Sequence, residues 1–130
     1  MKKIRSIIKE ESGQSIVEFA LVLPVLMLIV VGIVEFGWLF NGKITLTSAA
    51  REGARVAAIV KNQETATLAV NQTANLSGLT IEEVKYVIID GGLDDVDKVK
   101  VTVRGSMEPL ISLFIDDSVE MESVAYMRVE

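Results

Sequence analysis

The residues best suited to chemistry in this chain are a glycine and a glutamate placed five positions apart. Gly13 closes a short basic segment, and Glu18 stands at the start of a long apolar run. A carboxylate in a membrane helix costs about 2.5–3.5 kcal/mol at the helix centre and less toward the interface. Glu18 therefore requires a partner or a purpose. The pattern predicts that the chain is cut after Gly13 and then assembles into a filament through its apolar helix.

The composition excludes most other chemistry. The 130 residues include no cysteine and no histidine, so disulfides, thiol catalysis, Ser-His triads and zinc sites built on these residues are impossible within the chain. Residues 1–13 carry four basic and two acidic side chains, whereas the remainder carries nine basic and sixteen acidic ones. Because no basic patch follows the leader, nucleic acid is not an expected partner. We also expect no enzyme activity, cofactor, metal ion or small-molecule substrate.

The apolar run is long enough to cross a membrane. Phe19–Val34 holds sixteen residues without a charge, and continuing past Glu35 to Phe40 gives twenty-two; these lengths correspond to about 24 and 33 Å of helix. A bilayer core of about 30 Å places Glu35 near the outer interface. Its side chain is expected to snorkel toward water, and a buried functional carboxylate is the sharper alternative.

The distribution of charge predicts the topology of the membrane segment. Basic residues before the span place the N-terminus in the cytoplasm, and the C-terminal part then lies outside the cytoplasmic membrane after a single pass. A cleavable secretory signal, cut near Ala50, is a weaker alternative because its apolar region would be only about 7–15 residues long. Pro24 removes one backbone hydrogen bond, which predicts a kink or loosening that membrane helices tolerate.

A helix rich in small residues follows the membrane segment. Two stripes repeat every four residues, one on Ala49, Gly53 and Ala57 and the other on Ala50, Ala54 and Ala58. Small side chains let another backbone approach closely, which makes these positions candidates for helix–helix packing: Ala50, Gly53, Ala54 and Ala57. Packing of the same residues on the protein's own sheet is an equally weighted alternative, and the two kinds of packing can occur together. Glu52 is spaced to reach Arg55.

The C-terminal part has the pattern of a small sheet. The helical pattern extends to about Asn75, with a possible break at Asn41-Gly42. Strands are predicted at 84–89, 98–104 and 119–129, where Val99, Val101 and Val103 share one face. Residues 109–114 read as a helical turn or loop that covers the sheet. The acidic residues of the intervening loop fit a solvated hairpin better than a calcium site: Asp90, Asp94, Asp95 and Asp97.

The fold class expected from these elements is α+β. A long N-terminal membrane-spanning helix continues into a small outer domain, where a three-stranded antiparallel sheet packs on the helix. The sequence divides into a basic leader, an assembly helix, a small-residue helical stalk and a β-rich part, at residues 1–13, 14–40, 41–78 and 79–130.

Three segments resemble one family. Residues 13–24, Gly-Gln-Ser-Ile-Val-Glu-Phe-Ala-Leu-Val-Leu-Pro, resemble the N-terminus of TadE-like pseudopilins of the tight-adherence (Flp) pilus system. Residues 49–55, Ala-Ala-Arg-Glu-Gly-Ala-Arg, resemble the family's second signature, and residues 123–128 are similar to its last strand. TadF-like and TadG-like proteins share part of this pattern. The folded C-terminal part differs from the short, largely helical major pilins, which favours a minor or pseudopilin role.

The resemblance implies a processing site and a set of partners. A prepilin peptidase would cut between Gly13 and Gln14, and Glu18 would then pair with the new terminal amine of a neighbouring subunit. The implied partners are the membrane, the peptidase, other pilins or pseudopilins and the pilus assembly platform. An uncleaved single-pass protein with an extracytoplasmic binding or accessory domain is the alternative function.

Overall fold

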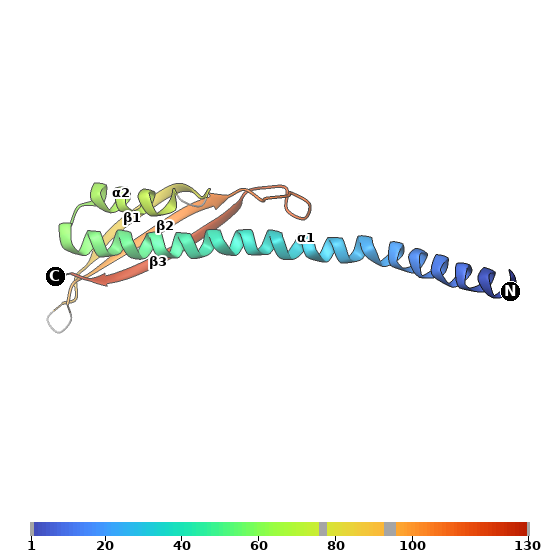
Figure 1. Cartoon of the computed structure of the whole chain (residues 1–130). Helices are drawn as coiled ribbons and strands as arrows, with labels where there is room; N and C mark the ends of the chain where they lie inside the picture. Colours follow the sequence, from blue (N-terminus) through green and yellow to red (C-terminus); the bar gives the residue numbers. More distant parts are fainter. Residues whose placement is uncertain (1, 76–77, 93–95, 130) are drawn as a thin grey trace. The chain divides into compact units, whose positions relative to one another are not determined.

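The computed structural model describes residues 2–75, 78–92 and 96–129, with side chains from Gly13 onward. These residues form two helices followed by three strands (Figure 1): α1 (Lys2–Val60), α2 (Gln63–Ala74), β1 (Thr80–Ile89), β2 (Lys98–Met107) and β3 (Val119–Arg128). The chain separates into two compact units, Met1–Val34 and Glu35–Glu130. The α+β class and the three antiparallel strands expected from the sequence are confirmed.

Helix α1 is continuous across two positions where a disturbance was expected. Pro24 lies inside the helix, and the possible break at Asn41-Gly42 is wrong because α1 runs through both residues. The break comes instead at Lys61, whose φ of 53° is left-handed. The Lys61 amide donates to the Ala57 carbonyl at 2.9 Å, which ends the helix with a left-handed cap.

Helix α2 begins immediately after this break. Asn62 has an extended backbone, and its side-chain oxygen accepts a hydrogen bond from the Glu64 amide at 2.9 Å. This contact satisfies one of the free N–H groups of the first turn, as an asparagine N-cap does. The helix ends at Ala74, with Asn75 as its C-cap. The sequence pattern located this end correctly but missed the reversal between the two helices.

The sheet has the order β1-β2-β3, and both neighbouring pairs are antiparallel. A register shift between Ile81 and Glu83 places an extra residue in β1, as in a β-bulge. The predicted alternation in β2 is confirmed, because Val99, Val101 and Val103 are fully buried. All three strands are longer or shorter by a few residues than the sequence pattern indicated.

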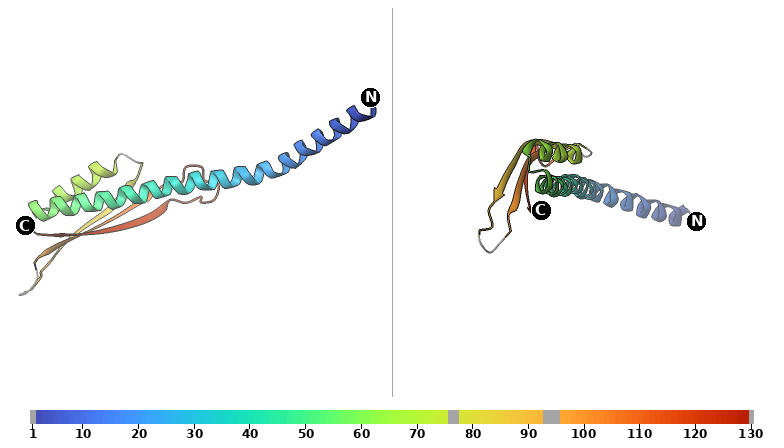
Figure 2. Two further views of the ribbon diagram at one scale, coloured as in Figure 1. Left: turned by 60° about the horizontal axis from the view of Figure 1, so that its bottom comes forward. Right: turned by 90° about the vertical axis from the view of Figure 1, so that its left-hand side faces the viewer.

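Both helices contribute to one core with the sheet. The buried apolar residues come from the second half of α1, from α2, from the inner sheet face and from the position just before β1: Leu46, Ala49, Ala50, Ala54, Ala57, Ala58, Ala66, Val70, Ala74, Leu79, Val99, Val101, Val103, Met107 and Ala125. Figure 2 shows α2 beside this part of α1, with the sheet against them. The predicted packing of the sheet on the long helix forms most of this core, and α2 contributes the remaining residues.

The connection between β2 and β3, residues 108–118, does not cover the sheet. The prediction that residues 109–114 form such a cover is wrong, because four large apolar side chains in this stretch face solvent. Leu110, Ile111, Leu113 and Phe114 are 44–58% exposed. The core is already closed by the two helices, so these side chains have no place in it.

Candidate functional site

The predicted processing site lies in the unit Met1–Val34. Gly13 and Gln14 are helical and exposed, and nothing lies within 4 Å of where a Cβ on Gly13 would stand. The Gln14 side-chain amide donates to Glu18 Oε1 at 3.2 Å, one helical turn along. The structure therefore brings two of the three predicted residues together on one exposed helix face. Gly13 makes no packing contact that would constrain its replacement.

The apolar run after Glu18 is unpartnered within its own unit. Its side chains from Phe19 to Val30 are all exposed, with Phe19 at 61% and Leu21 at 73%. Among the described residues, a single helix is long and apolar enough to cross a membrane. Exposed apolar surface of this length needs an apolar solvent or a partner, which supports a single-pass membrane protein.

The small-residue seam of α1 is occupied by the chain's own elements. Ala50, Ala54 and Ala57 are fully buried in the core of the outer unit. A Cβ added to Gly53 would lie 2.5 Å from Val70 Cγ2 of α2. The four predicted packing positions therefore serve packing within the chain, of α1 on α2 and the sheet. Glu52 and Arg55 form the predicted pair on the exposed face, with an Oε1 to Nη2 distance of 2.6 Å.

Glu35 differs from its expected environment. It is only 3% exposed, so the prediction of a side chain snorkelling toward water is wrong. Its two carboxylate oxygens accept hydrogen bonds from consecutive backbone amides, Oε1 from Leu110 and Oε2 from Ile111, each at 3.0 Å. One turn along α1, Trp38 Nε1 donates to the Glu108 carbonyl at 3.2 Å.

These two side chains attach the β2–β3 connection to α1. Farther along α1 the Lys43 ammonium donates to the Glu122 carbonyl of β3, and Ser123 Oγ donates to Thr47 Oγ1 at 3.3 Å. Sequence reasoning missed this row of contacts because the partners lie 70 to 79 positions apart. The available signal was a carboxylate in an apolar helix with a tryptophan three residues later.

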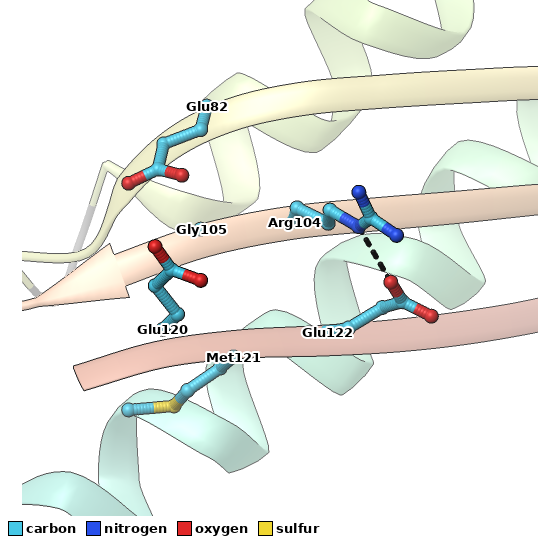
Figure 3. Close-up of a pocket in the computed structure, with 6 residues that line it drawn as sticks. All are labelled: Glu82, Arg104, Gly105, Glu120, Met121 and Glu122. Atoms are coloured by element: carbon cyan, nitrogen blue, oxygen red, sulfur yellow. Dashed lines mark hydrogen bonds and ion pairs between the residues drawn. The ribbon is translucent and has the colours of Figure 1, made fainter.

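The outer face of the sheet carries a charged hollow (Figure 3). The hollow is lined by Glu82, Glu120, Glu122 and Arg104, together with Gly105 and Met121. Arg104 Nε lies 2.6 Å from Glu122 Oε2, and its Nη1 lies 3.6 Å from Glu83 Oε2. The hydrogen bond from Arg104 lowers the pKa of the Glu122 carboxyl. Because these pairs are exposed, solvent screens them and their contribution to stability is small.

The described parts of the chain show no cluster of side chains that would bind a metal ion. No group of three or more acidic, cysteine or histidine side chains there is placed to hold a metal ion. In the predicted acidic loop, Asp90 and Asp97 accept hydrogen bonds from the Gly92 and Gly91 amides. Asp94 and Asp95 lie outside the described residues.

Comparison with known families finds a match to part of the chain. The model of the family described as "TadE-like protein" matches residues 13–55. These residues include the predicted cleavage position, the apolar run and the first part of the small-residue seam. The match confirms the resemblance read from the sequence and indicates a membrane protein associated with a Tad pilus system. This family is structural rather than enzymatic. Comparisons with curated proteins and with solved structures each find no significant match.

Proposed function

We propose, from the TadE-like region formed by residues 13–55, that this chain is a minor pseudopilin of a Tad pilus. In this proposal a prepilin peptidase cuts the chain between Gly13 and Gln14. The processed chain remains in the cytoplasmic membrane, with its C-terminal domain outside, until it joins a pilus or its assembly platform. The observation that carries the proposal is Glu18, an exposed carboxylate one helical turn after the residue that would become the new N-terminus.

The chemistry of assembly follows from that spacing. Cleavage removes the basic leader and creates a charged amine on Gln14 at the edge of an apolar helix. In a low-dielectric setting an unpaired charge is costly, and an opposite charge at hydrogen-bond distance offsets much of that cost. The Glu18 carboxylate of one subunit can pair with the terminal amine of its neighbour. The exposed apolar side chains of the same helices would then bury one another in place of lipid.

Processing can be tested directly on the protein from its native membrane. We expect the intact mass and N-terminal sequence to show a chain starting at Gln14 when the prepilin peptidase is present, and at Met1 when it is absent. Gly13→Leu should leave the precursor uncut, because a bulky side chain would stand at the bond to be cleaved. Gly37→Leu is a matched control, since Gly37 is also helical with nothing within 4 Å of a built Cβ.

Assembly is tested separately from cleavage. Glu18→Gln should be cut normally but should be lost from sheared pilus and assembly-platform fractions, because the amide cannot neutralise the neighbouring amine. A wild-type chain that still begins at Met1 in the presence of the peptidase would overturn the proposal. That result would favour the alternative, an uncleaved membrane protein whose outer domain has a binding or accessory role.

A further inference from the structure

The β2–β3 connection combines a fixed backbone with free apolar side chains. Its backbone is held by Glu35, through the Leu110 and Ile111 amides, and by Trp38, through the Glu108 carbonyl. Its large side chains nevertheless face outward: Leu110 is 52%, Leu113 58% and Phe114 51% exposed. A loop that is tied down while it presents apolar side chains marks an interaction surface.

The depth of this loop along α1 identifies what the surface meets. Twenty residues of helix, from Phe19 to Trp38, cover about 30 Å, which is the thickness of a bilayer core. If the membrane begins at Phe19, its far boundary therefore falls at Glu35–Trp38. The hydrogen bonds from Glu35 and Trp38 place the loop at the same level of the helix. On these turns of α1, Phe36 and Phe40 are also apolar and each 66% exposed.

The backbone hydrogen bonds suit entry into lipid. A non-helical backbone near lipid must have its polar groups satisfied by the protein, because no water is present to do so. Glu35 satisfies the two amides whose own side chains, Leu110 and Ile111, are the apolar ones. The same contacts satisfy the buried carboxylate, which would otherwise be costly at this depth. Each partner thus removes the other's cost of leaving water.

The charges around the loop also fit a membrane surface. Glu108 precedes the apolar side chains, and Asp116 and Asp117 follow them; all three are exposed. They would remain among hydrated headgroups while the apolar tips reach the acyl chains, and Trp38 is the residue type enriched at that boundary. Since the flanking charges are negative, attraction to anionic lipid plays no part.

We propose that residues 109–114 form a second membrane contact, a loop that inserts Leu110, Ile111, Leu113 and Phe114 into the far leaflet of the bilayer that α1 spans and that Glu35 holds at this depth. The contact fixes the outer domain against the membrane surface. The proposal rests on the membrane-spanning role of α1 and is independent of cleavage after Gly13.

The experiment uses the full chain in vesicles of zwitterionic phosphatidylcholine. Because the chain has no cysteine, a single introduced cysteine carries the only spin label. Leu113→Cys reports on the loop, and Val87→Cys, 51% exposed on β1, is the matched control. We expect the label at 113 to collide readily with oxygen, which concentrates in lipid, and to collide with a water-soluble nickel chelate several-fold less often than the label at 87.

Two further arms make the result decisive. Glu35→Gln keeps the size of the side chain but weakens its hold on the two amides, so the label at 113 should become more mobile and lose lipid contact, while the label at 87 is unchanged. Replacing part of the lipid with anionic phosphatidylglycerol should leave the depth at 113 unchanged.

Two results would overturn the proposal. Equal collision of both labels with the nickel chelate would show a loop in water. Shielding of the label at 113 from both oxygen and chelate, relieved when the protein is diluted in lipid, would show that a second copy of the chain covers the surface instead. Neither result would bear on the N-terminus at Gln14, which mass spectrometry reports separately.

Discussion

At the residue scale, two carboxylates of α1 have opposite surroundings. Glu18 is exposed and its hydrogen-bond donor is Gln14, one turn away on the same helix. Glu35 is buried and accepts from two backbone amides of a distant loop. Glu35 is therefore committed to holding its own domain together, whereas the exposed oxygens of Glu18 remain accessible to a group on another subunit. This difference supports the assignment of intersubunit pairing to Glu18 alone.

The Arg104–Glu122 pair predicts a measurable response to pH. The pKa of Glu122 lies below its ordinary value, chiefly because of the hydrogen bond from Arg104. A carboxyl with a lowered folded-state pKa stabilises the fold above the unfolded pKa, about 4.3 for Glu, and this stabilisation disappears as pH falls through the folded value. Arg104→Gln should therefore raise the Glu122 pKa and weaken the loss of stability on acidification.

The measurement is an NMR titration of the Glu122 carboxyl carbon in the full chain in detergent micelles. The Glu122 pKa should rise toward its ordinary value in the Arg104 variant, because Arg104 supplies the two largest effects that lower it, a hydrogen bond and a Coulombic attraction. Arg55→Gln is the matched control: it removes the partner of Glu52 and should leave the titration of Glu122 unchanged. An unaltered Glu122 pKa in the Arg104 variant would contradict the assigned cause.

Single residues were predictable from the sequence where their environment is set by near neighbours. The alternation of Val99, Val101 and Val103 identifies the buried face of β2, and the i,i+3 spacing identifies the Glu52–Arg55 pair. Glu35 was misjudged because its environment is set by amides some 75 positions away. No local pattern carries that information, since a backbone amide is available at almost any residue.

At the element scale, the reversal between α1 and α2 is the feature that the sequence pattern missed. Helical periodicity is similar on both sides of it, and the residues that make the turn are ordinary ones, Lys61 and Asn62. Glycine is the usual residue for the left-handed position, so a lysine there gave no signal. Gly42, where a break in α1 was expected, instead serves close packing, because a Cβ there would meet Met107 Sδ. A Cβ on Gly53, a predicted packing position, would meet Val70.

The turn between α1 and α2 predicts opposite changes in stability for substitutions at the adjacent positions Lys61 and Asn62. Lys61 adopts φ of 53°, and this left-handed conformation costs an L-residue about 1–2 kcal/mol. Glycine avoids this strain but loses more conformational entropy on folding, so a substitution to glycine recovers only part of the cost. Lys61→Gly should therefore raise the free energy of unfolding by about 0.5–1 kcal/mol. Asn62→Ala removes the cap on the Glu64 amide and should lower it by about 1 kcal/mol.

Chemical denaturation of the full chain in micelles provides the measurement for both variants. Lys61→Ala is the control, because it removes the same charged side chain but keeps a Cβ at the left-handed position. It should leave stability nearly unchanged. A gain in Lys61→Ala equal to that in Lys61→Gly would assign the effect to charge rather than to backbone strain.

At the scale of the whole molecule, the two units depend on different surroundings. The unit Met1–Val34 contributes none of the buried core residues found in the described chain, which all lie between Leu46 and Ala125. Its described side chains are mostly exposed and need lipid or other subunits. The fold class could be read from the sequence because the change from apolar helix to alternating strands is strong. The anchoring of the β2–β3 connection could not be read from the sequence, because it joins segments that lie far apart in the chain.

The division predicts that residues 34–130 fold without the membrane segment. This fragment keeps the whole core and the two side chains that hold the β2–β3 connection, Glu35 and Trp38, so it should unfold cooperatively in mild detergent at close to the full chain's temperature. A fragment of residues 44–130 keeps the core but loses Glu35, Trp38 and Lys43, and with them the contacts to residues 108–122. It should unfold at a lower temperature, with amide exchange rising first at Leu110 and Ile111. Equal stability of the two fragments would show that the contacts of Glu35, Trp38 and Lys43 add nothing to the stability of the fold. Non-cooperative unfolding of the longer fragment would show that the domain requires the membrane helix.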